Sequence, residues 1–236
     1  MVTALLLAGG VGSRVGDTIP KQFICIHGVP VIVYTMYAFQ KNRNIDDIVV
    51  VCLEGWEKKV QQLAEKYKIT KLKRIVKGGK NTQESISNGV FGVEDIISSD
   101  DILLVHDSVR AMVNDEIIDD CIDVCRQYGN GCASIPLQET IVRTEDRICG
   151  NINIDRSKIM RVQTPQAYKY GLILDIYKKA EEQNIKESIY TNTLAIELGY
   201  TIYFSKGSIF NVKITTPEDL ELMSMFLDLK KISLDG

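Results

Sequence analysis

Histidine is scarce in this sequence of 236 residues, which contains only His27 and His106. None of its six cysteines forms a C-x-x-C pair with another. Zinc sites are usually built from closely spaced cysteine and histidine ligands, so we expect no zinc site. Several cysteines fall inside apolar stretches, where a free thiol packs as a small hydrophobic group. The cysteine pattern therefore predicts a reduced protein, and we expect it to be cytoplasmic.

A strong charge of one sign and long apolar runs are also missing. The formal net charge is -3 and no block of like charges occurs, which argues against bulk binding to nucleic acid. No apolar run approaches the length of a membrane span. Residues 1–8 are apolar but lack a basic n-region, so they predict a strand rather than a signal peptide. We expect a soluble protein with no nucleic-acid partner and no membrane partner.

Apolar strands and amphipathic helices alternate along most of the chain. Buried strands are expected at 1–8, 47–52, 74–76, 101–106 and 131–135, and helices at 30–41, 56–67, 82–97 and 115–128. This alternation predicts an α/β fold with a doubly wound, mostly parallel, Rossmann-like sheet. Because no linker, repeat or low-complexity stretch interrupts it, we expect a single domain over residues 1–236. Such folds bind ligands at the carboxyl ends of their strands.

The pattern changes between residues 140 and 154. The pieces TIVR, TEDR and ICGNINI predict two short strands around a polar turn, a β-hairpin inserted at about 138–157. A protruding hairpin has unpaired edges that a second subunit can close, so we predict a dimerisation arm and a homodimer. A surface hairpin without consequence is the alternative, and the sequence barely separates the two. The remaining chain predicts a segment at 162–165, helices near 172–183 and 193–198, strands at 201–205 and 212–214, and a last helix from Thr216.

The stretch 5–22, LLLAGGVGSRVGDTIPKQ, begins as a buried strand and opens into a glycine-rich loop. Loops of this kind bring bare backbone amides to a phosphate. The glycine spacing matches neither the dinucleotide-binding pattern nor the Walker pattern. A tight strand-to-helix turn is the alternative, but such a turn needs no cations, and this loop carries Arg14 and Lys21. We interpret the loop as a phosphate-binding element.

Candidate functional residues also occur at two later strand ends. Asp107 directly follows a buried strand, where a carboxylate can hold a hard cation. A helix cap or an ion pair with Arg110 is the alternative for that carboxylate. Gly79 with Ser85 forms either a second glycine site or a plain turn. His106 continues an apolar run, so we expect it to be packed and hydrogen bonded rather than a base.

Isolated polar and cationic residues lie in or beside apolar segments at Thr140, Arg156 and Lys213. A lone lysine in a strand is usually solvated. However, cations occur at three separate places in one α/β chain, since Arg14 and Lys21 form a further group. This distribution suggests a ligand that carries phosphate at more than one place.

Taken together, these pieces resemble one known family. The chain is similar to the CTP-dependent cytidylyltransferases that act on sugar-alcohol phosphates, a group that includes methylerythritol-phosphate and ribitol-5-phosphate enzymes. The matching pieces, in family order, are LLLAGGVGSRVGDTIPKQF, GG followed by Ser85, VHDSVR, ETIV, DR six residues before VQTPQ, and NVKITTPEDL. They cover nearly the whole chain, and they are specific as a set although no single piece is.

The resemblance implies a role for each part of the site. The cytidine would be held around Ala8, Gly9, Gly10, Gly79 and Ser85. The triphosphate would be held by Arg14 and Lys21, with Mg²⁺ on Asp107. The acceptor phosphate would be held by Thr140, Arg156 and Lys213, with the arm reaching across a dimer. Further substrate contacts are expected from Ser108, Arg110, Thr191 and Asn192. The residues implied in catalysis are Arg14, Lys21, Asp107 and Lys213.

The implied reaction needs positioning rather than a general base. The nucleophile is a phosphate oxygen of the acceptor, and a phosphate monoester with a second pKa near ~6 is largely dianionic at neutral pH. Catalysis then depends on orientation, a metal, and cations where negative charge builds. A chain that is poor in histidine suits such a reaction.

Ser108 and the segment SIFNVKITTPEDL resemble the ribitol type, so we expect transfer of CMP from CTP to ribitol 5-phosphate or a close polyol phosphate, for cell-surface polymer synthesis. Departures from the family pattern at Thr82, Ala111 and Asn192 leave the acceptor open, and cytidylylation of 2-C-methyl-D-erythritol 4-phosphate is the first alternative. Sugar-1-phosphate nucleotidyl transfer, a NAD-type dehydrogenase and a non-catalytic relative are further alternatives. The broken glycine spacing argues against the dehydrogenase, and retention of the cations and of Asp107 argues against a non-catalytic relative.

Overall fold

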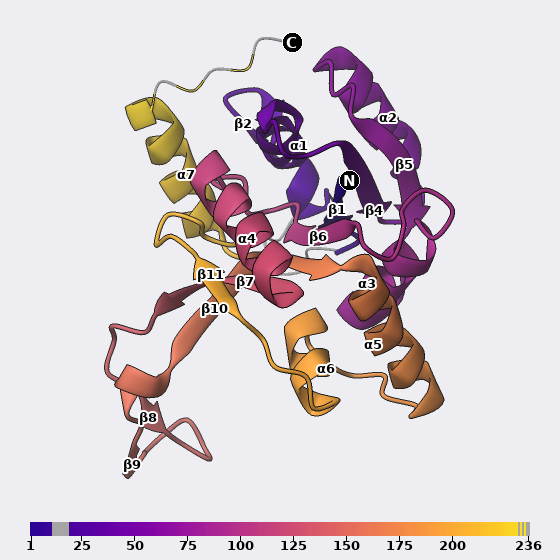
Figure 1. The fold of residues 1–236 in the computed structure, drawn as a ribbon. Coiled ribbons are helices and arrows are strands. Elements are labelled where there is room, and N and C mark those ends of the chain that lie inside the picture. The colour runs from indigo at the N-terminus through magenta and orange to yellow at the C-terminus, as the bar shows by residue number, and fades with distance from the viewer. Residues whose placement is uncertain (11–18, 231, 233, 235–236) are drawn as a thin grey trace.

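The computed structural model describes residues 1–10, 19–230, 232 and 234, and a seven-stranded sheet lies at its centre (Figure 1). The strand order is β11-β7-β10-β6-β1-β4-β5. The strands are β1 (Val2–Ala8), β4 (Asp47–Cys52), β5 (Leu72–Lys77), β6 (Ile102–Asp107), β7 (Asn130–Pro136), β10 (Met160–Lys169) and β11 (Phe204–Lys206). Neighbours are parallel except where β10 runs antiparallel to β6 and β7. The predicted mostly parallel α/β sheet is confirmed.

Helices cover both faces of this sheet. Those packed on one face are α1 (Val31–Lys41), α2 (Glu57–Lys66), α4 (Asp115–Tyr128) and α7 (Pro217–Lys230). Those packed on the other face are α3 (Thr82–Phe91), α5 (Tyr170–Glu182) and α6 (Thr191–Glu197). Successive residues of β1 enter opposite clusters, because Leu5 packs in the cluster of Ile86 and Leu6 in the cluster of Ile32. A strand buried on both faces explains the continuous apolar run that predicted it.

A short connection links β1 to α1. It contains the 3-10 helix η1 (Lys21–Phe23) and a small hairpin of β2 (Cys25–Ile26) and β3 (Val29–Pro30). The aromatic ring of Phe23 stacks on Trp56, with ring centroids 4.4 Å apart and planes 16° from parallel. This stack fixes η1 against the segment that precedes α2.

The inserted hairpin is present between β7 and β10. Its strands β8 (Val142–Arg143) and β9 (Ile152–Asn153) pair antiparallel, and η2 (Arg156–Lys158) follows them. The hairpin projects away from the body of the molecule (Figure 1). It prolongs two strands that are already paired, because Met160 of β10 lies opposite Pro136 of β7. Its use in dimerisation stays a prediction.

Several boundaries differ from those that the sequence predicts. The helix α3 ends at Phe91 rather than near residue 97, because Gly92 caps it and a run of turns follows. The expected strand at 212–214 is wrong. No strand in the described part of the chain pairs with that segment, and the Ile214 N–H donates to the Val109 carbonyl in the loop after β6 at 3.0 Å. No helix in the described part of the chain is long and apolar enough to cross a membrane.

Candidate active site

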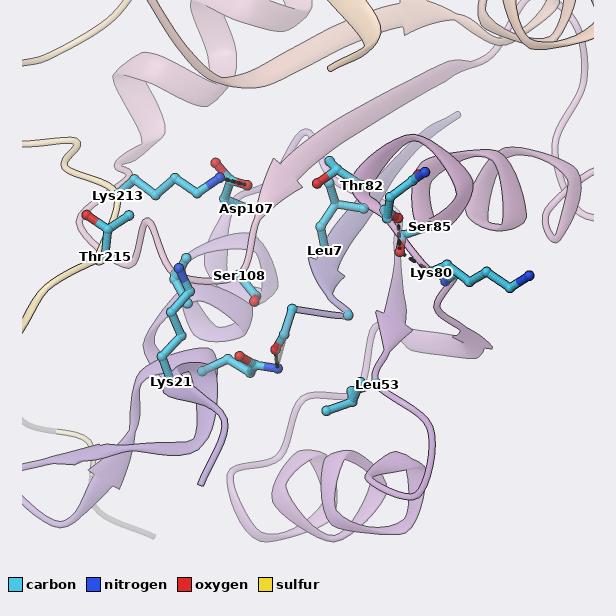
Figure 2. Close-up of a pocket in the computed structure, with 16 residues that line it drawn as sticks. Leu7, Lys21, Leu53, Lys80, Thr82, Ser85, Asp107, Ser108, Lys213 and Thr215 are labelled. Atoms are coloured by element: carbon cyan, nitrogen blue, oxygen red, sulfur yellow. Dashed lines mark hydrogen bonds and ion pairs between the residues drawn. The ribbon is translucent and has the colours of Figure 1, made fainter. Parts of the chain in front are cut away.

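A cavity of about 700 Å³ opens at the carboxyl ends of β1 and β6 (Figure 2). It lies at the switch point of the sheet, because β1 pairs with β4 on one side and with β6 on the other. The predicted residues that line it are Gly9, Gly10, Lys21, Gly79, Ser85, Asp107, Ser108 and Lys213. The fold thus brings together residues that are as far apart in the sequence as Gly9 and Lys213.

Close packing of two glycine segments forms one wall of the cavity. A Cβ at Gly9 would lie 3.2 Å from the Ser85 hydroxyl oxygen, and a Cβ at Gly79 would lie 2.4 Å from Glu84 Cγ. The Gly79 N–H donates to the Ser85 hydroxyl at 3.0 Å, and that hydroxyl donates to the Asn81 carbonyl at 2.8 Å. Glycine is therefore required at 79, and the wall exposes backbone atoms to a ligand.

The start of α3 is capped by the side chains of Asn81 and Glu84. The Asn81 side chain accepts a hydrogen bond from the Glu84 N–H at 2.8 Å, and the Glu84 carboxylate accepts one from the Lys80 N–H at 2.8 Å. The cap positions Ser85 one turn later, at the cavity wall. A local sequence signal thus places a residue of the site.

The first loop is described only in part. Ala8 is 1% exposed and does not line the cavity. Its carbonyl accepts hydrogen bonds from the Leu53 N–H at 3.2 Å and from Gln22 Nε2 at 2.8 Å. Lys21 Nζ donates to the Ile214 carbonyl at 3.0 Å, which joins the first loop to the segment before α7. Arg14 lies outside the described residues.

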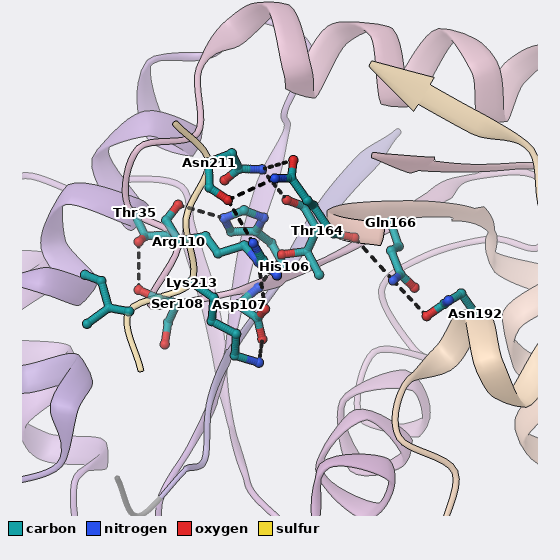
Figure 3. A network of polar contacts seen from close by, with 12 residues as sticks. Thr35, His106, Asp107, Ser108, Arg110, Thr164, Gln166, Asn192, Asn211 and Lys213 are labelled. Atoms are coloured by element: carbon teal, nitrogen blue, oxygen red, sulfur yellow. Dashed lines mark hydrogen bonds and ion pairs between the residues drawn. The ribbon is translucent and has the colours of Figure 1, made fainter. Parts of the chain in front are cut away.

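A buried carboxylate joins two cations at the end of β6 (Figure 3). Asp107 accepts from Arg110 Nε on one oxygen and from Lys213 Nζ on the other, each at 3.0 Å. Burial by itself would raise the pKa of Asp107, but the charges of Lys213 and Arg110 outweigh it and hold the pKa below its usual value. The side chain of Lys213 is 38% exposed and that of Asp107 is 8% exposed, so Lys213 can also reach a ligand.

The surroundings of Asp107 are compatible with a nucleotide-borne metal. No group of three or more His, Cys, Asp or Glu side chains gathers anywhere in the described residues. Mg²⁺ commonly uses one or two carboxylates and takes its remaining ligands from substrate phosphates and water. A single carboxylate at the cavity fits that pattern and does not fit an all-protein cage. The assignment of Mg²⁺ to Asp107 stays a prediction.

His106 is a packed, hydrogen-bonded histidine, as expected. It is fully buried, and its Nε2 donates to the Arg110 carbonyl at 3.2 Å. Burial lowers its pKa to about 3, so the imidazole is neutral at physiological pH. Its contact with the Arg110 backbone holds the turn that carries Asp107. This histidine is therefore unsuited to act as a general base.

Ser108 contributes a hydroxyl that the protein leaves unused. It lines the cavity but is 1% exposed, and its Oγ has no hydrogen-bond partner within the described chain. Its carbonyl accepts from the Thr35 hydroxyl at 2.7 Å, which fixes the residue. A buried hydroxyl without a partner costs about 1–3 kcal/mol, so a bound substrate could supply the missing contact.

Six predicted substrate residues do not line the cavity of their own chain, namely Ala8, Arg110, Thr140, Arg156, Thr191 and Asn192. Thr140 and Arg156 are exposed at the base of the hairpin, where Arg156 donates to the Gln138 carbonyl. Thr191 and Asn192 are buried in the first turn of α6. The Thr191 hydroxyl meets the Tyr177 hydroxyl at 3.0 Å, and Asn192 Oδ1 accepts from Gln166 Nε2 at 3.0 Å (Figure 3). In this conformation both are parts of the packed core.

Some residues of the site were missed by the sequence analysis. The Thr164 hydroxyl accepts from the Asp107 N–H at 3.1 Å, and Thr215 and Gln22 line the cavity. Gln22 stands between Lys21 and Phe23 in the quoted loop, and that was the available signal. Thr164 stands within the quoted piece VQTPQ, but its contact could not be predicted, because its partner Asp107 is 57 positions away.

Fold and site together define a class of protein. A glycine-rich strand end, a second glycine wall and three lysines meet at the switch point of a doubly wound sheet. Proteins with this arrangement bind nucleotides through backbone amides and cations. The chain is thus an α/β nucleotide-binding protein with one buried, doubly paired carboxylate at its ligand cavity.

Comparison with known proteins narrows the class. The family model of 2-C-methyl-D-erythritol 4-phosphate cytidylyltransferase matches residues 2–228. A ribitol-5-phosphate cytidylyltransferase of Lacticaseibacillus paracasei is 42% identical and covers 98% of this chain and 100% of its own. A 2-C-methyl-D-erythritol 4-phosphate cytidylyltransferase of Clostridium novyi is 38% identical, with 95% and 96% covered. The solved 4-diphosphocytidyl-2C-methyl-D-erythritol synthase of Anaerococcus prevotii has a TM-score of 0.80 at 22% identity, covering 96% and 98%, and shows the shared fold.

The chain belongs to the 2-C-methyl-D-erythritol 4-phosphate cytidylyltransferase family. It is a nucleotidyltransferase enzyme, a cytidylyltransferase that acts on a polyol phosphate. The resemblance stated from the sequence is confirmed, as is the enzyme class.

Proposed function

We propose that the enzyme transfers CMP from CTP to ribitol 5-phosphate, or to a close polyol phosphate, and releases pyrophosphate. The observation that carries this choice is the 42% identity, over essentially both whole chains, to a protein named ribitol-5-phosphate cytidylyltransferase. Ser108, which resembles the ribitol type, supports it. The product would be a CDP-polyol for cell-surface polymer synthesis, made in the cytoplasm, where all six cysteines stay free as they are here.

The chemistry requires no proton transfer by the protein. An oxygen of the acceptor phosphate attacks the α-phosphorus of CTP, the bond to the β-phosphate oxygen breaks, and pyrophosphate carries the charge away. Because the acceptor phosphate is largely dianionic at neutral pH, its oxygen is already a nucleophile. The neutral, buried His106 agrees with a site that works by positioning and charge.

The described residues divide between the two substrates. The glycine wall of Gly9, Gly10 and Gly79, with Ser85, would hold the cytidine, and Lys21 with Arg14 would hold the triphosphate. Lys213 would release part of its pairing with Asp107 to meet the acceptor phosphate. Mg²⁺ on Asp107 would neutralise triphosphate charge when the nucleotide is bound.

The β-hairpin arm bears on the oligomeric state of the enzyme. Thr140 and Arg156 are exposed and do not line the cavity of their own chain, yet the resemblance assigns both to the acceptor phosphate. Apolar side chains are exposed on the same hairpin, including Ile148 at 89% and Val142 at 51%. We infer a homodimer in which each arm covers the cavity of the other chain. This arrangement would satisfy the residue roles and bury the apolar side chains.

Cytidylylation of 2-C-methyl-D-erythritol 4-phosphate is the alternative, favoured by the 38% identity to the Clostridium novyi protein of that name. An acceptor panel with CTP and Mg²⁺ separates the two. We expect kcat/KM for ribitol 5-phosphate to exceed that for the methylerythritol phosphate by about ten-fold or more, because polar groups left unpaired by the wrong substrate cost affinity. Glycerol 3-phosphate is a third arm of the panel. A preference for the methylerythritol phosphate would establish the alternative.

A further inference from the structure

Gln22 joins the two ends of the short glycine segment that lines the nucleotide side of the cavity. Its side chain is buried, and Nε2 donates to the Ala8 carbonyl at 2.8 Å and to the Gly10 carbonyl at 3.0 Å. A carboxamide nitrogen has two hydrogens, so both are used. One side chain therefore orients two carbonyls, that of Ala8 before Gly9 and that of Gly10 after it.

Peptide planarity makes this contact directional. In a trans peptide the C=O and the following N–H point in opposite directions. Holding the Ala8 carbonyl on Gln22 thus fixes the Gly9 N–H on the opposite side of the chain. Glycine by itself leaves these dihedral angles free, since it has no Cβ. Without Gln22, the Gly10 carbonyl would lose this contact and, among the described residues, the Ala8 carbonyl would keep only the Leu53 N–H. Binding of the nucleotide would then carry a larger cost in backbone entropy.

The position of Gln22 is itself rigid. Phe23, the next residue, is 5% exposed and stacks on Trp56. Lys21, the preceding residue, donates to the Ile214 carbonyl at 3.0 Å. The three residues of η1 therefore connect the cavity lysine, the glycine segment and the core. A clamp on a rigid element can preorganise the backbone that it holds.

We propose that Gln22 is a positioning residue, which holds the Ala8 and Gly10 carbonyls and thereby orients the backbone of this glycine segment for the nucleotide and sets the affinity for CTP. This proposal rests on the proposed function in so far as the nucleotide is CTP. It assigns to Gln22 no contact with the reacting atoms.

The test uses two replacements of nearly the same size. Gln22→Met removes both donors, and Gln22→Glu places carboxylate oxygens against two carbonyls. We expect Gln22→Met to raise the KM for CTP by about ten-fold or more, since each lost hydrogen bond is worth about 0.5–1.5 kcal/mol and 1.4 kcal/mol is ten-fold. Gln22→Glu should raise it further. The KM for the acceptor should stay within about two-fold of wild type, because the acceptor side does not depend on this clamp.

Gln40→Met is the matched control. The Gln40 amide also makes two hydrogen bonds, to the Thr70 hydroxyl and from the Lys71 N–H, each at 2.9 Å, and it does not line the cavity. It should lose stability without a change in either KM. Thermal unfolding of all three variants separates loss of folded protein from loss of affinity, since a smaller folded fraction lowers apparent kcat and leaves KM unchanged.

Suppose that the wild-type enzyme releases pyrophosphate from CTP. An unchanged KM for CTP in Gln22→Met would then overturn the proposal for Gln22 and leave the proposed function intact. Equal rises in both KM values would also overturn it, because the effect would not be specific to the nucleotide. If neither variant folds, Gln22 is required for folding itself and the proposal is wrong. If the wild-type enzyme releases no pyrophosphate with CTP and any acceptor of the panel, it is the proposed function that fails.

Discussion

Lys21 and Lys80 both line the cavity, but their ammonium groups have different surroundings. Lys21 Nζ donates to the Ile214 carbonyl at 3.0 Å. The Lys80 side chain extends away from the other residues drawn in Figure 2. A cation assists phosphoryl transfer only where it meets the charge that develops in the transition state. We therefore expect different contributions to catalysis from these two lysines, although both line the same cavity.

The expected outcome is a large loss for one lysine and a small one for the other. Lys21→Ala should lower kcat/KM by ~10²-fold or more, which is the typical effect of removing one preorganised charge contact. Lys80→Ala should lower kcat/KM by less than about three-fold, because its ammonium group does not meet the developing charge. Steady-state release of pyrophosphate measures both, and circular dichroism checks that Lys21→Ala is folded. Equal losses in the two variants, or a wild-type rate for Lys21→Ala, would contradict the role given to Lys21.

Contacts of single residues could be predicted only when they are local. The pairing of Asp107 with Arg110 spans three positions, and an ion pair was one of the alternatives considered for Asp107. Its pairing with Lys213 spans 106 positions and exists only once the loop after β6 meets the segment before α7. The sequence placed Lys213 in a strand and gave it no partner. The buried positions of Thr191 and Asn192 were hidden for the same reason, because their partners come from α5 and β10.

At the level of elements, the bounds of a strand or helix could be predicted where a continuous apolar run or clear capping residues mark them. The strand β4 and the helix α4 have the predicted bounds, since the first is a continuous apolar run and the second is bounded by Asn114 and Gly129 as caps. The Gly129 cap has φ 90°, the left-handed region that favours glycine. The segment 212–214 alternates like a strand, yet it has no neighbour to pair with. Alternation of apolar and polar residues indicates that one side of a segment is buried. It does not indicate whether another strand lies alongside to pair with it.

The arm is the element whose function can be tested by mixing two inactive variants. Arg156→Ala damages the arm, and Asp107→Asn damages the cavity. If each arm serves the other chain, a mixed dimer contains one site with both residues intact. Random exchange of subunits then restores about a quarter of the wild-type sites, because half of the dimers are mixed and each has one intact site of two.

Activity of the mixture, against each variant alone, is the measurement. Native mass spectrometry establishes that mixed dimers have formed. No recovery in the presence of mixed dimers would show that an arm serves its own chain. A monomer in solution would contradict the dimer itself.

At the level of the whole molecule, the residues that line the cavity come from two parts of the sheet. The glycine wall comes from β1, β5 and the start of α3, whereas Asp107, Ser108 and Lys213 come from β6 and the segment before α7. A nucleotide held on the first side would present its α-phosphorus towards the second. The family resemblance predicted this arrangement because its pieces span nearly the whole chain. In the proposed reaction, the choice of acceptor would depend on the second side and on the arm.

The central claim is that an oxygen of the acceptor phosphate attacks the α-phosphorus of CTP. Ribitol 5-phosphate labelled with ¹⁸O in its phosphate, incubated with the enzyme, CTP and Mg²⁺, tests it in one measurement by ³¹P NMR and mass spectrometry of the products. The proposed mechanism predicts CDP-ribitol with ¹⁸O in the bridge between its two phosphorus atoms, and pyrophosphate without label. Release of CMP with no CDP-ribitol, or label in the pyrophosphate, would contradict it.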